Sequence, residues 1–128
     1  MILATALLLA AQSGGNCSAL APRLTSAVRR VEAARVTSLS RFRVRPADVS
    51  YVLGDANWRL VFATPADAER GVFVLRRVGR GYRLVDTWGG VMAPDEHGQA
   101  AAWARALSGG GVPARLATCM DRAIVAGR

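Results

Sequence analysis

The residue best suited to acid–base chemistry in this chain is its only histidine, His97, because an imidazole titrates near neutral pH. Asp95 and Glu96 precede it, but neighbours one or two positions apart point to different sides of a helix and do not orient the ring. No nucleophile motif of the G-x-S-x-G type and no H-E-x-x-H metal motif occurs in the sequence. The pattern therefore favours a surface histidine over a catalytic one.

A second candidate site is the stretch DTWGG at residues 86–90, which ends a predicted strand. Asp86 and Trp88 could line a pocket for a sugar or another small ligand, because strand ends commonly carry binding sites. Together with His97, such a pocket would support a small hydrolase-like enzyme, which is the first alternative function. The simpler interpretation makes Trp88 a core residue and the glycines a turn. The sequence leaves enzymatic activity open and leans against it.

Arginines form the third group of candidates. All 17 basic residues are arginine, against 9 acidic ones, and the formal net charge is +8. Guanidinium groups bind phosphate and carboxylate groups in a bidentate way, so arginine-rich stretches are candidate anion-binding surfaces. One stretch runs from residue 23 to residue 45, where Glu32 is the only acid, and another surrounds a predicted hairpin. The candidate residues are Arg23, Arg29, Arg30, Arg41, Arg43, Arg45, Arg80 and Arg83.

Two simpler explanations of the arginines remain open. A basic face can serve only to keep a protein soluble, since net charge concerns solubility and partners rather than fold. The complete absence of lysine also fits the codon bias of a GC-rich genome.

The sequence predicts neither a cofactor nor a metal site. Gly79-Arg80-Gly81 lacks the third glycine of a dinucleotide-binding G-x-G-x-x-G motif, because Leu84 occupies that position. The segment also joins two predicted strands rather than a strand and a helix. If the two cysteines pair with each other, one histidine and scattered carboxylates remain, and these form no recognisable metal-binding pattern.

The first residues predict export. The apolar run at residues 2–11 is too short for a membrane-spanning helix but has the length of a signal-peptide core. Ala11 and Ser13 have the small-x-small spacing that a signal peptidase requires, so residues 1–13 are expected to be a cleaved signal peptide. A buried N-terminal strand or helix is the alternative. Residues 14–128 would then form one domain, with a periplasmic or secreted location.

An exported protein with two cysteines is expected to contain a disulfide. Cys17 lies near the start of a predicted helix and Cys119 lies on the apolar side of the last one. We therefore predict a bond between Cys17 and Cys119, which pins the first helix against the last.

The order of predicted elements indicates an α+β fold. A helix is expected at residues 18–37 on an apolar stripe that includes Leu20, Leu24 and Val31. Residues 41–45 alternate like an edge strand, and residues 49–53 resemble a short helical turn. Three strands at residues 57–64, 71–78 and 81–88 form an antiparallel meander. Helices follow from Pro94 and Pro113, and all helices are expected to pack on one face of this three- to four-stranded sheet.

Charge, export signal and missing motifs together favour a non-enzymatic exported domain. The expected partner is an anionic envelope polymer, a lipid headgroup or an acidic protein, bound through the arginine-rich face. A nucleic-acid-binding module is the second alternative. The basic charge fits that alternative, whereas the export signal and the absence of a recognised nucleic-acid motif argue against it.

Overall fold

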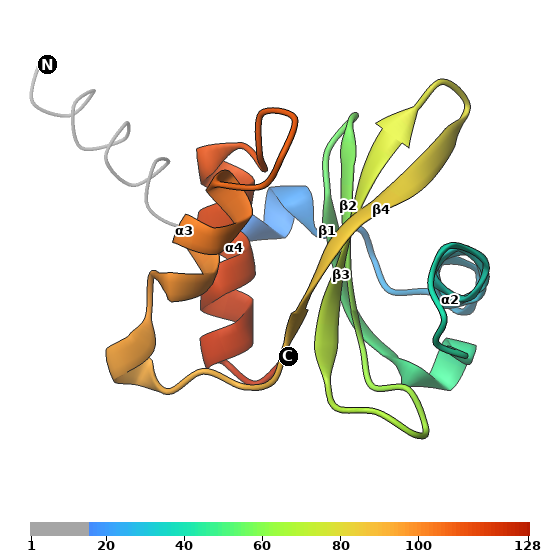
Figure 1. The fold of residues 1–128 in the computed structure, drawn as a ribbon. Helices are drawn as coiled ribbons and strands as arrows, with labels where there is room; N and C mark the ends of the chain where they lie inside the picture. The colour runs from blue at the N-terminus through green and yellow to red at the C-terminus, as the bar shows by residue number, and fades with distance from the viewer. Residues whose placement is uncertain (1–15) are drawn as a thin grey trace, which may run out of the picture.

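The computed structural model describes residues 16–128, so the predicted signal peptide at residues 1–13 lies outside the described residues. Four antiparallel strands form one sheet in the order β1-β2-β3-β4 (Figure 1). The strands are β1 (Val49–Gly54), β2 (Trp58–Ala63), β3 (Gly71–Val78) and β4 (Gly81–Gly89). The helices and short 3₁₀ turns are η1 (Asn16–Leu20), α2 (Ser26–Leu39), η2 (Pro46–Asp48), η3 (Pro94–Glu96), α3 (Gln99–Arg105) and α4 (Ala114–Val125). The predicted α+β fold is confirmed.

The helices cover both faces of the sheet, not one as predicted. In Figure 1, α2 lies on one side of the sheet, and α3 and α4 lie on the other. Trp58, Leu60 and Phe62 of β2 belong to the core beneath α3 and α4, whereas Val61 and Ala63 belong to the core beneath α2. The near-continuous apolar run of β2 is typical of a strand that is buried on both faces.

The N-terminal helix begins later than predicted and presents a different side to the sheet. The predicted helix at residues 18–37 is divided into η1 and α2, because Pro22 lacks the N–H that a continuous helix needs. Thr25 caps α2, and its hydroxyl oxygen accepts a hydrogen bond from the Val28 N–H at 3.2 Å. The side buried in α2 contains Glu32, Ala33 and Val36, while Val31 of the predicted stripe is 53% exposed.

The fourth strand lies after the segment where it was predicted. Residues 41–45 form no strand, and β1 occupies residues 49–54, where a helical turn was expected. Thr37 explains the first difference, because its hydroxyl bonds both the N–H of Val44 at 2.9 Å and the C=O of Val44 at 3.1 Å. That backbone is thereby satisfied by α2 rather than by a neighbouring strand. β1 instead pairs along β2, with a bulge between Val49 and Tyr51.

The predicted meander is confirmed in the centre of the chain. β3 and β4 pair with Val78 opposite Gly81, so Gly79 and Arg80 form a two-residue hairpin loop. Gly79 has a positive φ of 59°, which glycine adopts without a steric cost.

Both predicted C-terminal helices are present, but the first begins later than predicted. Pro94 begins η3 and not an α-helix, and Gly98, with φ of 93°, separates η3 from α3. α4 buries the predicted apolar side together with two further residues: Leu116, Ala117, Cys119, Met120, Asp121, Ala123 and Ile124.

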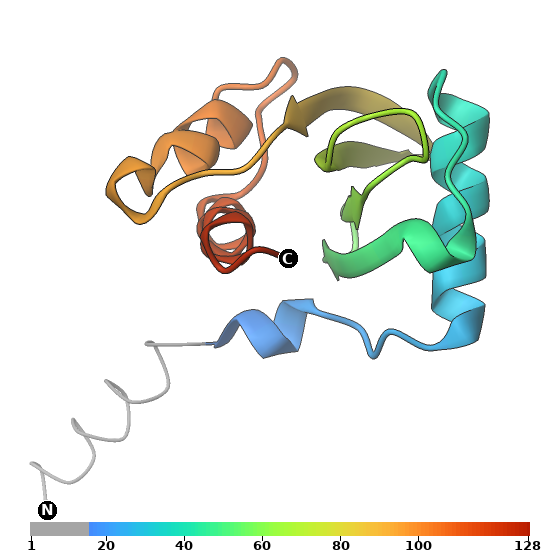
Figure 2. The same ribbon diagram turned by 90° about the horizontal axis from the view of Figure 1, so that it is seen from below.

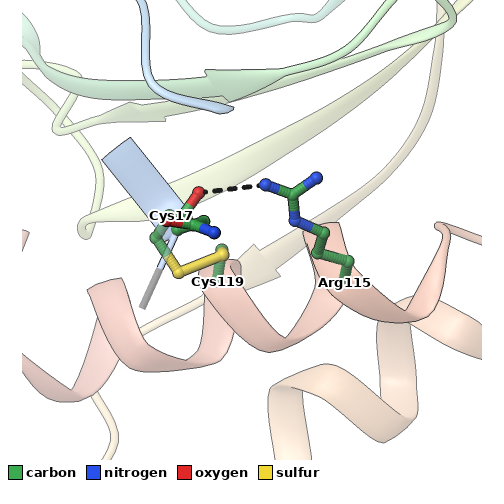
Figure 3. Close-up of a disulfide and its surroundings, with 4 residues drawn as sticks. Cys17, Arg115 and Cys119 are labelled. Atoms are coloured by element: carbon green, nitrogen blue, oxygen red, sulfur yellow. Dashed lines mark hydrogen bonds between the residues drawn. A yellow bond between two sulfur atoms is a disulfide. The ribbon is translucent and has the colours of Figure 1, made fainter. Parts of the chain in front are cut away.

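The Cys17–Cys119 disulfide is present, with a Cα–Cα distance of 5.4 Å (Figure 3). Beside it, Nη2 of Arg115 donates a hydrogen bond to the carbonyl oxygen of Asn16 at 3.3 Å. The bond joins η1 to α4, and the chain then passes to the other side of the sheet, where α2 begins (Figure 2). It therefore does not hold α2 against α4. Paired cysteines fit an oxidising compartment. Among residues 16–128, no helix combines the length and the apolar character that a membrane crossing requires.

Candidate anion-binding surface

Most arginines of the described chain form no ion pair. Within residues 16–128, only Arg35 and Arg45 form ion pairs, with Glu32 and Asp48 respectively. Four of the remaining arginines between residues 23 and 45 are exposed, and none of their side chains forms an ion pair within this part of the chain: Arg23, Arg30, Arg41 and Arg43. These side chains present uncompensated positive charge to solvent.

Arg29 and Arg35 have a different position, because both turn towards the sheet. The Arg29 guanidinium is half-buried and donates a hydrogen bond to the carbonyl oxygen of Val49 at 2.6 Å. Arg35 pairs with Glu32 and also lies over the ring of Tyr82, with 4.2 Å from its central carbon to the ring centroid. These two arginines attach α2 to β1 and β4, so a partner could bind Arg29 only by competing with Val49.

An open groove of about 420 Å³ runs between α2 and the segment after it. Arg30 lies on its α2 side and Arg43 on the opposite side, and the helix contributes Ala33, Ala34 and Thr37 to its walls. No acidic side chain lines this groove. An anion that enters it meets two arginines and no neighbouring carboxylate.

A second open groove, of about 300 Å³, meets the first at Arg43. Arg45 and Asp67 also line it. The Arg45 guanidinium pairs with Asp48 at 2.9 Å, and the hydrogen bond from Arg45 keeps the pKa of Asp48 below its ordinary value. Because Arg45 is shared with Asp48 and Asp67 stands nearby, the second groove attracts anions less strongly than the first.

Glu32, the one acid expected among these arginines, does not neutralise the exposed surface. Its side chain is buried between α2 and the sheet, with a relative exposure of 4% for the residue. Burial raises the pKa of Glu32, although the charges of Arg35 and Arg59 oppose this effect. Its Oε1 pairs with Arg35, while its Oε2 has no hydrogen-bond partner among the described residues.

The hairpin arginines divide in the same way. Arg76 donates to the carbonyl oxygen of Gly109 and lies 5.5 Å from the Trp58 ring centroid, and Arg77 donates to the Gly79 carbonyl at 3.2 Å. Arg80 and Arg83 are exposed, but neither lines the two grooves. They belong to a separate basic region at the end of the β3–β4 hairpin.

The alternative site residues have different surroundings in the structure. The Trp88 ring packs against Trp103, with 5.4 Å between ring centroids, and its Nε1 has no hydrogen-bond partner within the described chain. Asp86 is exposed and accepts a hydrogen bond from the Thr87 N–H at 2.8 Å. His97 lines an open cavity of about 530 Å³ between the start of α3 and α4, and neither Asp86 nor Trp88 lines it.

The most organised carboxylate is Asp121, which sequence reasoning missed. It lies on α4, is buried, and accepts hydrogen bonds from the Gly98 N–H at 2.8 and 2.9 Å and from the Ala101 N–H at 3.0 Å. It therefore caps the start of α3 from a different helix. An acid between Met120 and Ala123 on an apolar helix side was the available signal, because buried carboxylates need hydrogen-bond donors.

Among residues 16–128, no group of three or more histidine, cysteine, aspartate or glutamate side chains could hold a metal ion. No family model, no curated protein and no solved structure matches this chain. A functional assignment therefore depends on the surface chemistry described above.

Proposed function

We propose that this domain binds an anionic partner through the arginines of α2 and the segment 41–45. The observation that carries the proposal is the groove lined by Arg30 and Arg43, which contains no acidic side chain. Residues 23–48 hold seven arginines and two acids, and both acids are engaged by arginines within this unit. Bidentate guanidinium contacts suit phosphate, sulfate or carboxylate groups.

We further propose that the domain acts in the periplasm or outside the cell. The Cys17–Cys119 disulfide supports this location, because disulfides persist in oxidising compartments. Alkylation of intact cells before lysis tests it. Cysteines that are paired in the cell react with a thiol reagent only after reduction, whereas a cytoplasmic, reduced protein would be labelled at once.

Salt-gradient elution from immobilised heparin and co-sedimentation with anionic vesicles test the binding proposal. The informative variant is Arg30→Ala/Arg43→Ala. Its matched control is Arg105→Ala/Arg122→Ala, which removes the same charge from exposed positions on α3 and α4. If net charge alone mattered, both double variants would elute at the same salt concentration.

We expect the Arg30→Ala/Arg43→Ala variant to elute well before the control, because two guanidinium contacts with the anionic matrix are lost. Each arginine near an anionic surface contributes about 1 kcal/mol, or roughly fivefold in affinity. All binding should weaken with salt, since the Debye length is about 8 Å at physiological ionic strength. Equal elution of the two double variants would leave the arginine-rich face with only a solubilising role.

A further inference from the structure

The two open grooves are neighbours, because they share one lining residue. Arg43 lines both the groove beside α2 and the groove that reaches Asp67. Arg30 belongs only to the first groove, and Arg45 belongs only to the second. Three arginines thus follow one another along the surface in the order Arg30, Arg43, Arg45. We call these two adjoining grooves the arginine trough.

We propose that the arginine trough holds a segment of a linear anionic polymer. This inference rests on the proposed function and names its partner. A chain with repeated phosphate, sulfate or carboxylate groups can place one anion at Arg30 and further anions at Arg43 and Arg45. A single small anion would use one of these contacts and leave the others empty.

Concavity favours a chain over a lipid bilayer as the occupant. Arg30 and Arg43, which form no ion pair within residues 16–128, line the groove beside α2. A flat bilayer cannot follow the floor of a groove. An extended polymer is narrow enough to enter a groove, and each anion then contacts a guanidinium directly.

The composition of the trough also distinguishes this polymer from a nucleic acid. No aromatic side chain lines either groove. Proteins that bind single-stranded nucleic acids without sequence preference use aromatic rings on which successive bases stack. The trough offers charge and small side chains, so we expect it to bind an anionic backbone without reading bases.

Charge is distributed unequally along the trough, which gives it a strong and a weak end. The end with Arg30 has no carboxylate in its lining. At the other end Asp67 lines the groove, and Arg45 is already paired with Asp48 at 2.9 Å. Removal of the Asp67 charge should therefore strengthen polymer binding, whereas removal of an acid elsewhere should change it little.

Calorimetric titration with heparin disaccharide and heparin octasaccharide at about 0.15 M salt, where the Debye length is about 8 Å, tests the proposal. The variants are Arg30→Ala, Asp67→Asn and, as a matched control, Asp95→Asn, which removes one exposed acid far along the chain in η3. We expect Arg30→Ala to weaken octasaccharide binding about fivefold. Its effect on the disaccharide should be smaller, because a short fragment can bind around Arg43 alone.

Asp67→Asn should tighten octasaccharide binding about threefold. Asp95→Asn should stay close to wild type, because η3 lies on the α3 and α4 side of the sheet, opposite α2 (Figure 1), and exposed charges farther apart than a Debye length are screened. Equal effects of the two aspartate substitutions would contradict the proposal that the trough holds a polymer segment. Equal effects of Arg30→Ala on both heparin fragments would contradict it as well. In either case a loss of heparin binding in Arg30→Ala/Arg43→Ala would still support the proposed function.

Two further comparisons test whether the partner is a membrane or a nucleic acid instead of another anionic polymer. Tighter binding to anionic vesicles than to the octasaccharide, at equal concentrations of anionic groups, would make the partner a membrane and overturn the inference. Tighter binding to oligothymidylate would make it a nucleic acid and overturn it equally. If no arginine substitution alters binding to any of these probes, the proposed function fails together with the inference.

Discussion

The two helical layers of this domain are attached to the same sheet in different ways. On one side, α4 buries seven residues, of which Leu116, Met120 and Ile124 are large and apolar, and a disulfide joins it to η1. On the other side, α2 buries only Glu32, Ala33 and Val36. The first layer is held mainly by apolar packing and a covalent bond, and the second depends strongly on polar contacts.

This difference explains why the candidate binding surface lies on α2. A helix that buries few residues leaves many side chains exposed, and in α2 and the segment after it several of these are arginines. The contacts that hold α2 to the sheet, from Arg29 to the Val49 carbonyl and from Arg35 to the Tyr82 ring, also use arginines. Arginines therefore have two roles in this layer. Those whose guanidinium contacts the sheet attach α2, and those without a protein partner give the surface its charge.

The largest expected effect comes from the α4 layer. Cys17→Ala/Cys119→Ala, or reduction of the wild type, removes a bond that spans 102 positions of sequence. In the chain-entropy model such a loop stabilises the folded state by about 4.7 kcal/mol. Urea unfolding of the oxidised and reduced protein should show this loss. Heparin binding at low urea should be unchanged, since η1 and α4 lie away from the trough; a parallel loss of binding would argue against separate roles for the layers.

A smaller loss is expected at Asp121. Asp121→Ala removes the acceptor for the N–H groups of Gly98 and Ala101, and buried donors without a partner cost about 1–3 kcal/mol. We expect the free energy of unfolding to fall by about 2 kcal/mol. Asp95→Ala serves as the control, because Asp95 is exposed. Its free energy of unfolding should fall by less than about 0.5 kcal/mol. Equal losses would show that the cap on α3 contributes little.

The α2 layer should respond more weakly. Arg29→Met keeps an apolar stem but loses the hydrogen bond to the Val49 carbonyl. A loss of about 1 kcal/mol is expected, and Arg30→Met, at an exposed neighbouring position, should be nearly neutral. Heparin retention should show the reverse order, with Arg30→Met the more damaging. If the same variant showed the larger loss in both assays, Arg29 and Arg30 would not have separate roles in attachment and binding.

Sequence patterns correctly predicted those elements whose structure depends on the residues within the element itself. The β2–β3–β4 meander, the apolar side of α4 and the Cys17–Cys119 bond followed from alternation, helical periodicity and cysteine count. The α+β class followed from the order of these elements. Alternation and helical periodicity are local signals that agree with the tertiary contacts, and two cysteines leave only one intramolecular pairing.

The errors fall where a distant residue decides the local structure. Residues 41–45 alternate like a strand, but Thr37 satisfies the backbone of Val44 from α2. The start of α3 depends on Asp121, which is 23 positions from Gly98. Arg29 and Arg30 are adjacent in sequence, and only the position of Val49 shows which one is engaged. Candidate arginines could therefore be named from sequence, but not sorted into exposed and attached ones.

The carboxyl groups of two ion pairs, one within α2 and one in the segment after it, are expected to have pKa shifts in opposite directions. Glu32 and Arg35 are three positions apart, as are Asp48 and Arg45. Desolvation raises the pKa of Glu32 from 4.5, whereas the hydrogen bond from Arg45 lowers the pKa of Asp48 from 3.8. Carboxyl ¹³C shifts followed with pH should give a midpoint above 4.5 for Glu32 and below 3.8 for Asp48.

The raised pKa of Glu32 makes the stability of the α2 layer depend on pH. Above the unfolded-state value of 4.5, the folded protein keeps a proton that the unfolded chain has released, so the free energy of unfolding falls as pH rises through the folded-state pKa. The stabilising contribution is therefore complete below pH 4.5 and lost above the folded-state pKa. Glu32→Gln cannot titrate, and both proteins share the opposite contribution of Asp48. The difference in unfolding free energy, wild type minus Glu32→Gln, should thus decrease as pH rises through that window. If the difference increased instead, the charges of Arg35 and Arg59 would outweigh the effect of burial on the pKa of Glu32. The charged form of Glu32 would then stabilise the fold.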